Sequence, residues 1–161
     1  MLAISLLAVP SVLGWYLGAH YDDAAPLARV TEVLDGDTIV VAFADGSTDT
    51  VRLLGINTPE THHPTKPVEC YGPEAAAYAT RRLAGRVVRL EGDVESRDLY
   101  GRRLAYVLLE GERFNDELLR KGYARLLVIA PNRSHAHALL EAELAARHAG
   151  RGLWGRCGEG G

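Results

Sequence analysis

The stretch from residue 35 to residue 60 gathers the polar side chains that chemistry on a phosphate group needs. Asp37 stands near its start, and Asn57, Thr58 and Glu60 stand at its end. Calcium in proteins prefers oxygen ligands, and the Asp37 carboxylate, the Asn57 amide and the Thr58 main-chain carbonyl could supply them. These residue types predict a site for a hard cation.

An arginine and a glutamate in the same stretch indicate what the cation would act on. Arg52 could hold a phosphate through two parallel hydrogen bonds from its guanidinium group. Glu60 follows Asn57 by three residues, where its carboxylate could take a proton from an attacking water. Between them, Pro59 favours an extended backbone at the preceding residue and so helps to shape the loop. The combination is typical of phosphodiester cleavage.

Two short strands should bring these side chains together. Residues 38–43 and 51–54 are rich in β-branched and apolar side chains, and residues 44–47 between them carry the Asp-Gly signal of a hairpin turn. Antiparallel pairing would place Asp35 and Asp37, before the first strand, close to the residues that follow the second. We expect turn geometry beside a glycine to be the main role of Asp35.

The remaining apolar patterns predict three further strands and three helices. The strands are expected at residues 28–34, 86–91 and 103–109, which gives five strands in all and enough for a small closed barrel. The helices are expected at residues 75–83, where Gly72 and Pro73 mark the start, at residues 114–121, and after a Ser134 cap. The sequence therefore predicts the α+β class.

The third helix has a testable orientation. We expect Leu140 and Leu144 to share its buried face, and Glu143 and Arg147, four residues apart, to lie on its solvent side.

The chain begins with an apolar segment that differs from the rest. Residues 2–19 are uncharged and mostly apolar, which is marginally long enough for a membrane helix and long for a signal peptide without a basic start. We expect residues 1–25 to be a signal peptide or a membrane anchor with a linker, and residues 26–161 to form the domain. A buried helix of the domain is the third reading. Export, with the domain outside the cytoplasm, follows from the first two.

Two cysteines, Cys70 and Cys157, lie far apart in the chain. In an oxidising compartment they could close a disulfide, and otherwise they are two unpaired thiols. A zinc site is disfavoured because neither cysteine has a Cys-x-x-Cys partner or a nearby histidine pair.

The overall charge carries no sign of polyanion binding. The chain has a net charge of −3 at pH 7, whereas nucleic-acid binders usually show a basic excess. A cation and locally placed arginines could still hold a phosphate backbone, because turnover does not require tight binding.

Five motifs in one order resemble the thermonuclease family, whose members carry a staphylococcal nuclease-like domain. The resemblance runs from about Arg29 to Trp154 and implies a five-stranded OB-fold β-barrel with three α-helices. The motifs are Asp-Gly-Asp-Thr at 35–38, Arg-Leu-Leu-Gly-Ile-Asn-Thr-Pro-Glu-Thr at 52–61, Tyr-Gly-Pro-Glu-Ala at 71–75, Asp-Leu-Tyr-Gly-Arg at 98–102 and Leu-Ala-Tyr at 104–106.

The resemblance also implies roles for individual residues. It implies a nuclease, dependent on Ca2+, that cleaves DNA and RNA to 3′-phosphate products. Nothing in the sequence suggests an obligate partner, and we expect a monomer. Arg52 and Arg102 would contact the phosphate, and Glu60 would be the general base. The implied metal ligands are Asp37, Asn57 and Thr58, and the implied substrate contacts are Tyr100 and Lys66.

Two departures from the family pattern limit what can be carried over. Asn57 replaces an aspartate, so the calcium site loses one formal charge and weaker metal affinity is expected. Residues 126–129 are apolar and lack the family's tyrosines, whose stacking on a base can contribute about 1–3 kcal/mol each. A nonenzymatic OB-fold module that binds single-stranded nucleic acid or a protein is the alternative. Retention of Asp37, Arg52, Glu60 and Arg102 disfavours it.

Overall fold

The computed structural model describes residues 25–61 and 67–157. The apolar segment at residues 2–19 and Lys66 therefore lie outside the described residues. Within the described ranges, no helix has the length and apolar character needed to cross a membrane.

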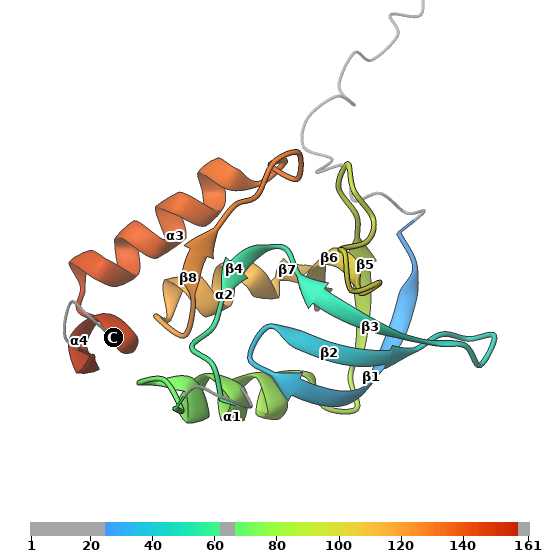
Figure 1. The fold of residues 1–161 in the computed structure, drawn as a ribbon, viewed down its shortest axis with the longest axis horizontal. Coiled ribbons are helices and arrows are strands. Elements are labelled where there is room, and N and C mark those ends of the chain that lie inside the picture. The colour runs from blue at the N-terminus through green and yellow to red at the C-terminus, as the bar shows by residue number, and fades with distance from the viewer. Residues whose placement is uncertain (1–24, 62–66, 158–161) are drawn as a thin grey trace, which may run out of the picture.

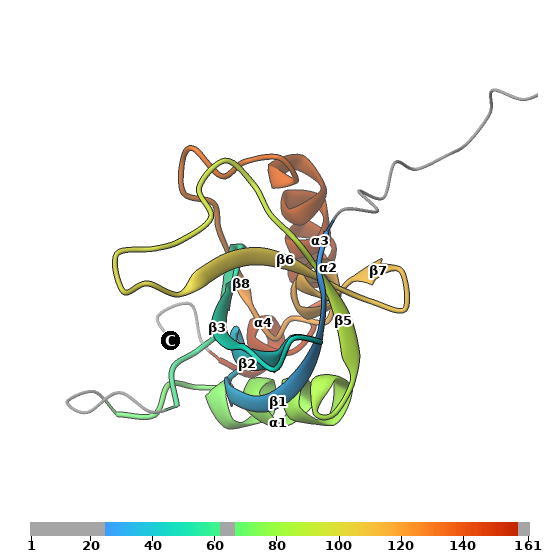
Figure 2. The same cartoon turned by 90° about the vertical axis from the view of Figure 1, so that its right-hand side faces the viewer.

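Five strands close into a barrel, which confirms the predicted OB-fold in the α+β class (Figures 1 and 2). The first three form an antiparallel meander, the first also pairs with the fourth, and the fourth pairs with the fifth. Parallel pairing between the third and fifth strands completes the ring. The strands are β1 (Leu27–Asp35), β2 (Thr38–Ala42), β3 (Thr48–Leu53), β5 (Val87–Glu91) and β6 (Arg103–Leu109).

The barrel closes because each strand turns β-branched or aliphatic side chains inward. Ile39 and Val51 are opposite each other across β2 and β3, and both side chains are fully buried. Val30 on β1 and Val107 on β6 are fully buried as well. Burial of a side chain of this size stabilises the folded state by roughly 1.5–3 kcal/mol.

Short elements extend the barrel on one side. A two-residue strand, β7 (Glu112–Arg113), pairs with β6, and a separate two-stranded sheet joins β4 (Gly55–Asn57) to β8 (Arg125–Leu127). The three predicted helices are present, and a short fourth follows them (Figure 1). They are α1 (Gly72–Leu83), α2 (Phe114–Arg120), α3 (Ala136–His148) and α4 (Leu153–Arg156).

The predicted orientation of the third helix is wrong. Leu140 and Leu144 are 40% and 52% exposed, whereas Glu143 is buried. The Glu143 carboxylate accepts a hydrogen bond from the main-chain N–H of Leu126 on β8 (3.2 Å) and another from Arg147 (3.2 Å). This face turns inward because it also carries the buried apolar side chains of Leu139, Ala142 and Ala146, and the hydrogen bonds to Glu143 satisfy its buried carboxylate.

The predicted Ser134 cap is also wrong, because His135 occupies the N-cap of α3. The Ser134 hydroxyl donates instead to Asp93 Oδ1 (2.7 Å), and its N–H donates to Asp93 Oδ2 (3.0 Å). Asp93 thus ties the start of α3 to the chain after β5.

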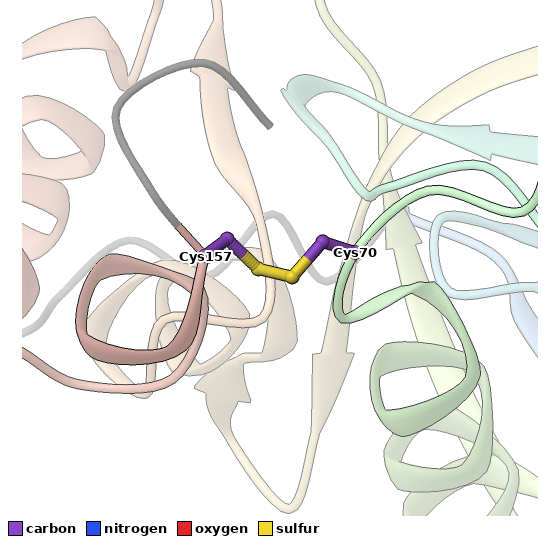
Figure 3. Close-up of a disulfide and its surroundings, with 2 residues drawn as sticks. All are labelled: Cys70 and Cys157. Carbon is purple, nitrogen blue, oxygen red and sulfur yellow. A yellow bond between two sulfur atoms is a disulfide. The ribbon is translucent and has the colours of Figure 1, made fainter.

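The two cysteines are paired, which decides between the alternatives that the sequence leaves open. Cys70 and Cys157 form a disulfide with their Cα atoms 6.0 Å apart. Figure 3 shows that the bond joins the chain just before α1 to the chain just after α4.

Candidate active site

The β2–β3 hairpin brings together the two ends of the polar stretch, as its antiparallel pairing predicts. Thr38 is paired with Arg52, and Leu53 donates its N–H to the carbonyl of Asp37 (2.9 Å). The Thr58 N–H then donates to Asp37 Oδ2 (2.7 Å). The turn before β2 can approach this closely because residue 36 is a glycine. A Cβ at Gly36 would lie 2.7 Å from Thr58 Cγ2.

The Asp37 carboxylate is buried at the centre of these contacts. Only 6% of Asp37 is exposed. Its Oδ2 lies 3.3 Å from Arg52 Nη2, and its Oδ1 accepts from the Thr38 hydroxyl (3.1 Å). A buried carboxylate needs such donors, since desolvation of an unpaired charge is costly.

Arg52 is held from several sides by main-chain and side-chain acceptors. Its Nη2 donates to the carbonyl of Ile56 (2.8 Å) and to Asn57 Oδ1 (3.2 Å), and its Nη1 donates to the carbonyl of Leu53. Burial lowers the pKa of Arg52, the negative charge of Asp37 opposes that shift, and the positive charge of Arg102 adds to it. The guanidinium stays charged at neutral pH because its ordinary pKa is far above 7.

Arg102 lies on the turn that precedes β6. Asp98 Oδ2 accepts from Arg102 Nε (2.7 Å), and Asp98 Oδ1 accepts from the main-chain N–H groups of Arg102 (2.9 Å) and Tyr100 (2.9 Å). The Arg102 guanidinium carbon also lies 5.4 Å from the centre of the Tyr100 ring. Asp98 thus shapes the turn that presents both residues. The sequence motif contains Asp98, but the motif alone does not indicate that its side chain holds the turn.

Asp35 is a third carboxylate near Asp37 and Glu60, and their negative charges act on it. Asp35 Oδ1 accepts from the Gly36 N–H (2.8 Å), as expected of a turn residue, and from the Thr61 hydroxyl (3.1 Å). Burial raises the pKa of Asp35, hydrogen bonds from Gly36 and Thr61 oppose the shift, and the negative charges of Asp37 and Glu60 add to it. A cation bound near Asp35 and Asp37 would relieve this repulsion.

Glu60 is anchored within its own loop and by a residue that the sequence analysis missed. Its Oε1 accepts from the Thr61 N–H (2.9 Å). The Glu60 N–H donates to Glu69 Oε2 (3.1 Å), and the Glu69 N–H donates to the carbonyl of Glu60 (2.9 Å). Glu69 adjoins Cys70, so the disulfide fixes the segment against which the Glu60 loop rests. No sequence motif marks Glu69, because the contact spans a loop.

The two arginines line one pocket of about 490 Å³, which also contains Tyr100. Leu127 and Ile129, 41% and 65% exposed, form an apolar part of its lining, in the stretch where the family has tyrosines. Asp37, Thr58 and Glu60 are not part of its lining, and Arg52 connects the pocket to Asp37. The expected substrate contact Lys66 is outside the described residues.

The residues around Asp37 suit a hard cation. Within residues 25–61 and 67–157, no three acidic, histidine or cysteine side chains are close enough to hold a metal by themselves. The expected set therefore relies on one carboxylate, the Asn57 amide and the Thr58 carbonyl, all of them oxygen donors of the kind that calcium takes. Thr58 Oγ1 is, in addition, a buried oxygen without a hydrogen-bond partner.

The fold and the pocket together define an OB-fold protein with a cationic pocket beside an acidic loop. A family model described as staphylococcal nuclease homologue matches residues 50–156. The chain is 40% identical to a thermonuclease of Staphylococcus hyicus over 78% of its own length and 74% of that protein. It is 41% identical to a thermonuclease of Staphylococcus intermedius over 79% of its own length and 75% of that protein.

A relative outside the staphylococci extends the likeness. The endonuclease YncB of Bacillus subtilis (strain 168) is 35% identical over 86% of the chain and 67% of that protein. The chain belongs to the staphylococcal nuclease homologue family.

Proposed function

We propose that this protein is a calcium-dependent nuclease that hydrolyses phosphodiester bonds of DNA and RNA and leaves 3′-phosphate products. Membership of the family, with relatives named thermonuclease and endonuclease, supports a hydrolase acting on nucleic-acid phosphodiester bonds. The observation that carries the proposal is that Arg52 and Arg102 line one pocket while Asp37 lies 3.3 Å from Arg52 at its edge.

The arginines bind and orient the phosphate. Main-chain carbonyls already hold the Arg52 guanidinium group in place, so little side-chain entropy is lost when a phosphate binds. Arg102 lines the same pocket from the turn that precedes β6, and the two positive charges stabilise the extra negative charge that develops on the five-coordinate phosphorus.

Glu60 acts as the general base. Its carboxylate takes a proton from a water molecule, the water oxygen bonds to phosphorus, and the bond from phosphorus to the 5′ oxygen breaks. The leaving 5′ oxygen takes a proton from solvent, and the phosphate remains on the 3′ side. Glu69 positions this base by accepting the Glu60 N–H and donating its own N–H to the Glu60 carbonyl.

Asp37, Asn57 and the carbonyl of Thr58 would hold calcium, with Asp35 and Glu60 adding negative charge nearby. A bound calcium ion would supply positive charge to the phosphate oxygens. Asn57 Oδ1 is also an acceptor for Arg52 (3.2 Å), so the amide is placed between the proposed metal site and the phosphate site.

Tyr100 and Lys66 are the proposed substrate contacts. Tyr100 is 86% exposed and stands over Arg102, where a base or sugar could pack against its ring. Leu127 and Ile129 offer apolar contact to a base, but no hydrogen-bonding group, so base preference should be weak.

We further propose that the protein is exported and acts as a monomer outside the cytoplasm. The Cys70–Cys157 disulfide supports an oxidising compartment. The apolar segment at residues 2–19 would be its signal peptide or would hold it at a membrane.

Hydrolysis of single-stranded DNA and RNA by the full chain tests the proposal. Rates are compared with calcium, with magnesium and with a chelator, beside Glu60→Gln, and 3′-phosphate ends are scored on the products. We expect calcium-dependent cutting that Glu60→Gln reduces by about 100-fold or more. Glu112→Gln, an exposed glutamate on β7, is the matched control and should cut normally. A folded protein that binds DNA but never cuts it would favour the nonenzymatic binding module.

A further inference from the structure

A second pocket of about 490 Å³ is lined by residues of α1, of the end of α2 and of the segment between α3 and α4, and none of the residues described above as catalytic or metal-binding lines it. The side chains that line it are Tyr78, Glu117, Arg120, Lys121, Tyr123 and Arg151.

Three of these side chains are exposed cations from two different segments. Arg120 and Lys121 end α2, and Arg151 precedes α4. Among the described residues, no carboxylate forms an ion pair with any of the three. Arg120 and Lys121 lie at the negative end of α2, and Arg151 lies just past the negative end of α3, where its N–H donates to the carbonyl of Ala146 (2.9 Å). Three positive charges therefore gather at one pocket, and none of them is in an ion pair with a described carboxylate.

The backbone after α2 and the backbone before α4 are in direct contact. Gly122 adopts a left-handed conformation (φ +74°), and a Cβ at this position would lie 2.2 Å from the carbonyl oxygen of Arg151. The Gly122 carbonyl accepts the N–H of Leu153 (2.9 Å), and Arg151 Nη1 donates to the carbonyl of Arg120 (3.3 Å). A side chain at position 122 would separate the cations.

The one carboxylate in the pocket lining is already neutralised. Glu117 accepts from Arg82 Nε (2.8 Å) and Nη2 (3.1 Å), and also from the Tyr78 hydroxyl. Because Arg82 balances Glu117, the charges of Arg120, Lys121 and Arg151 dominate the pocket. An anionic ligand is the chemistry that this arrangement fits.

A stack of tyrosines connects the pocket to the catalytic loop. The Tyr78 and Tyr123 ring centres are 4.3 Å apart, and the Tyr123 and Tyr71 ring centres are 5.4 Å apart. Tyr71 follows the segment in which Glu69 bonds to Glu60 (3.1 Å). A strand that leaves the catalytic loop along these rings would reach the three cations.

We infer that this pocket binds backbone phosphates of a nucleic-acid strand outside the bond that is cut. The inference rests on the proposed function, since it assigns the pocket to the same substrate. It accounts for how a chain with a net charge of −3 could hold a polyanion, because long-range repulsion must be offset by cations placed where phosphates lie.

Direct binding by the full chain tests the inference without relying on turnover. Fluorescence anisotropy with chelator present would compare single-stranded DNA of about 20 nucleotides with a dinucleotide. The double variant Lys121→Gln/Arg151→Gln removes two cations of the pocket. The control Arg29→Gln/Arg86→Gln removes two exposed cations from the region between β1 and β5.

We expect the pocket variant to bind the longer DNA about tenfold more weakly at low salt, with the slope of log affinity against log salt reduced by about 1.4. Binding of the dinucleotide should not change, and the control should lose about twofold at most. Equal losses in both double variants, or unchanged binding of the longer DNA, would overturn the inference. Inorganic phosphate that binds the pocket, while the longer DNA is unaffected by the variant, would show that the ligand is a free anion and would overturn it too.

A failure of the proposed nuclease function gives a different pattern. In that case the DNA is bound with the predicted dependence on Lys121 and Arg151, but it stays intact when calcium is added.

Discussion

The two arginines of the candidate active site are held by two regions of opposite character. Arg52 lies on β3 inside the barrel wall, with 14% of its side chain exposed, and carbonyls, an amide and a carboxylate surround it. Arg102 lies on a surface turn, with 32% of its side chain exposed, and its ion pair is to Asp98 in the same turn. The first arginine belongs to the fold, and the second is presented by a local loop.

Because of this difference, loss of Arg52 should lower both stability and activity, whereas loss of Arg102 should lower activity with little effect on stability. Removing Arg52 would leave main-chain carbonyls and Asp37 buried without their donor, and such groups are costly in the folded state. Removing the Arg102 side chain would cost little, because Asp98 keeps the main-chain N–H groups of residues 100 and 102 as donors and partly exposed ion pairs contribute little. Loss of either arginine should weaken the contacts that bind the substrate phosphate.

The largest expected effect is that of Arg52→Ala. Hydrolysis should fall by roughly 100- to 1,000-fold, and the free energy of unfolding should fall by about 3 kcal/mol. Rates with single-stranded DNA and urea unfolding followed by circular dichroism measure the two. A variant as stable as the parent chain would show that Arg52 is not part of the barrel's buried network.

Arg102→Ala should lose a comparable share of activity while its free energy of unfolding stays within about 1 kcal/mol of the parent. The neighbouring Arg103→Ala is the matched control. Arg103 pairs with Asp49 (3.0 Å) and does not line the active-site pocket, so turnover should be retained. Unchanged turnover in Arg102→Ala would remove this residue from the mechanism.

Glu69→Ala should have a smaller effect that appears in kcat more than in KM. The Glu60 N–H loses its acceptor, and the base is held less well, so we expect about a tenfold loss of kcat. Glu69→Gln keeps a side-chain oxygen and should recover most of the rate. If both variants are equally slow, or neither is, the hydrogen bond from Glu60 does not position the base.

The smallest effect concerns the acid stability of the turn that carries Arg102. Burial alone would raise the pKa of Asp98, but hydrogen bonds from Arg102 and Tyr100 outweigh it and lower the pKa below its ordinary value of 3.8. Because the folded-state pKa is depressed, this stabilisation is present above about pH 4 and is lost as the pH falls through the folded-state value.

Thermal unfolding of the parent and of Asp98→Asn between about pH 6 and pH 2 measures that contribution. The parent should lose slightly more stability than the variant over the acidic part of the range. Parallel curves for the two proteins would show that Asp98 titrates alike in the folded and unfolded states.

The sequence predicted the parts of the fold that depend on local patterns. The two strands predicted at 38–43 and 51–54 are present as Thr38–Ala42 and Thr48–Leu53, joined by the Asp-Gly turn. The start of α1 was predicted to within one residue, because Tyr71 is the N-cap and Gly72, the predicted cap, is the first helical residue. Pairing of the first two strands is enough to bring Asp37 to Thr58. The roles of Arg52, Glu60 and Arg102 remain proposals, although the structure places both arginines on one pocket.

The predictions that failed depend on contacts between residues from distant segments of the chain. The buried face of α3 carries Leu139, Ala142, Glu143 and Ala146, a series with helical spacing that was passed over in favour of Leu140 and Leu144. The periodicity does not reveal the N–H of Leu126, which donates to the buried Glu143 carboxylate. Ser134 binds Asp93 instead of capping the helix, and Glu69 meets Glu60 across a loop. Each of these contacts depends on tertiary proximity, which hydrophobic patterning does not encode.

The disulfide would hold the domain together after a protease cleaves its chain once. Cys70 and Cys157 are 87 residues apart, so β5, β6, α2, α3 and the turn that carries Arg102 all lie between them. A protease that cleaves the exposed turn at residues 97–102 would leave two fragments joined through sulfur. A nicked molecule would thus keep both arginines on one particle, and it would separate into two peptides only when a reductant is added.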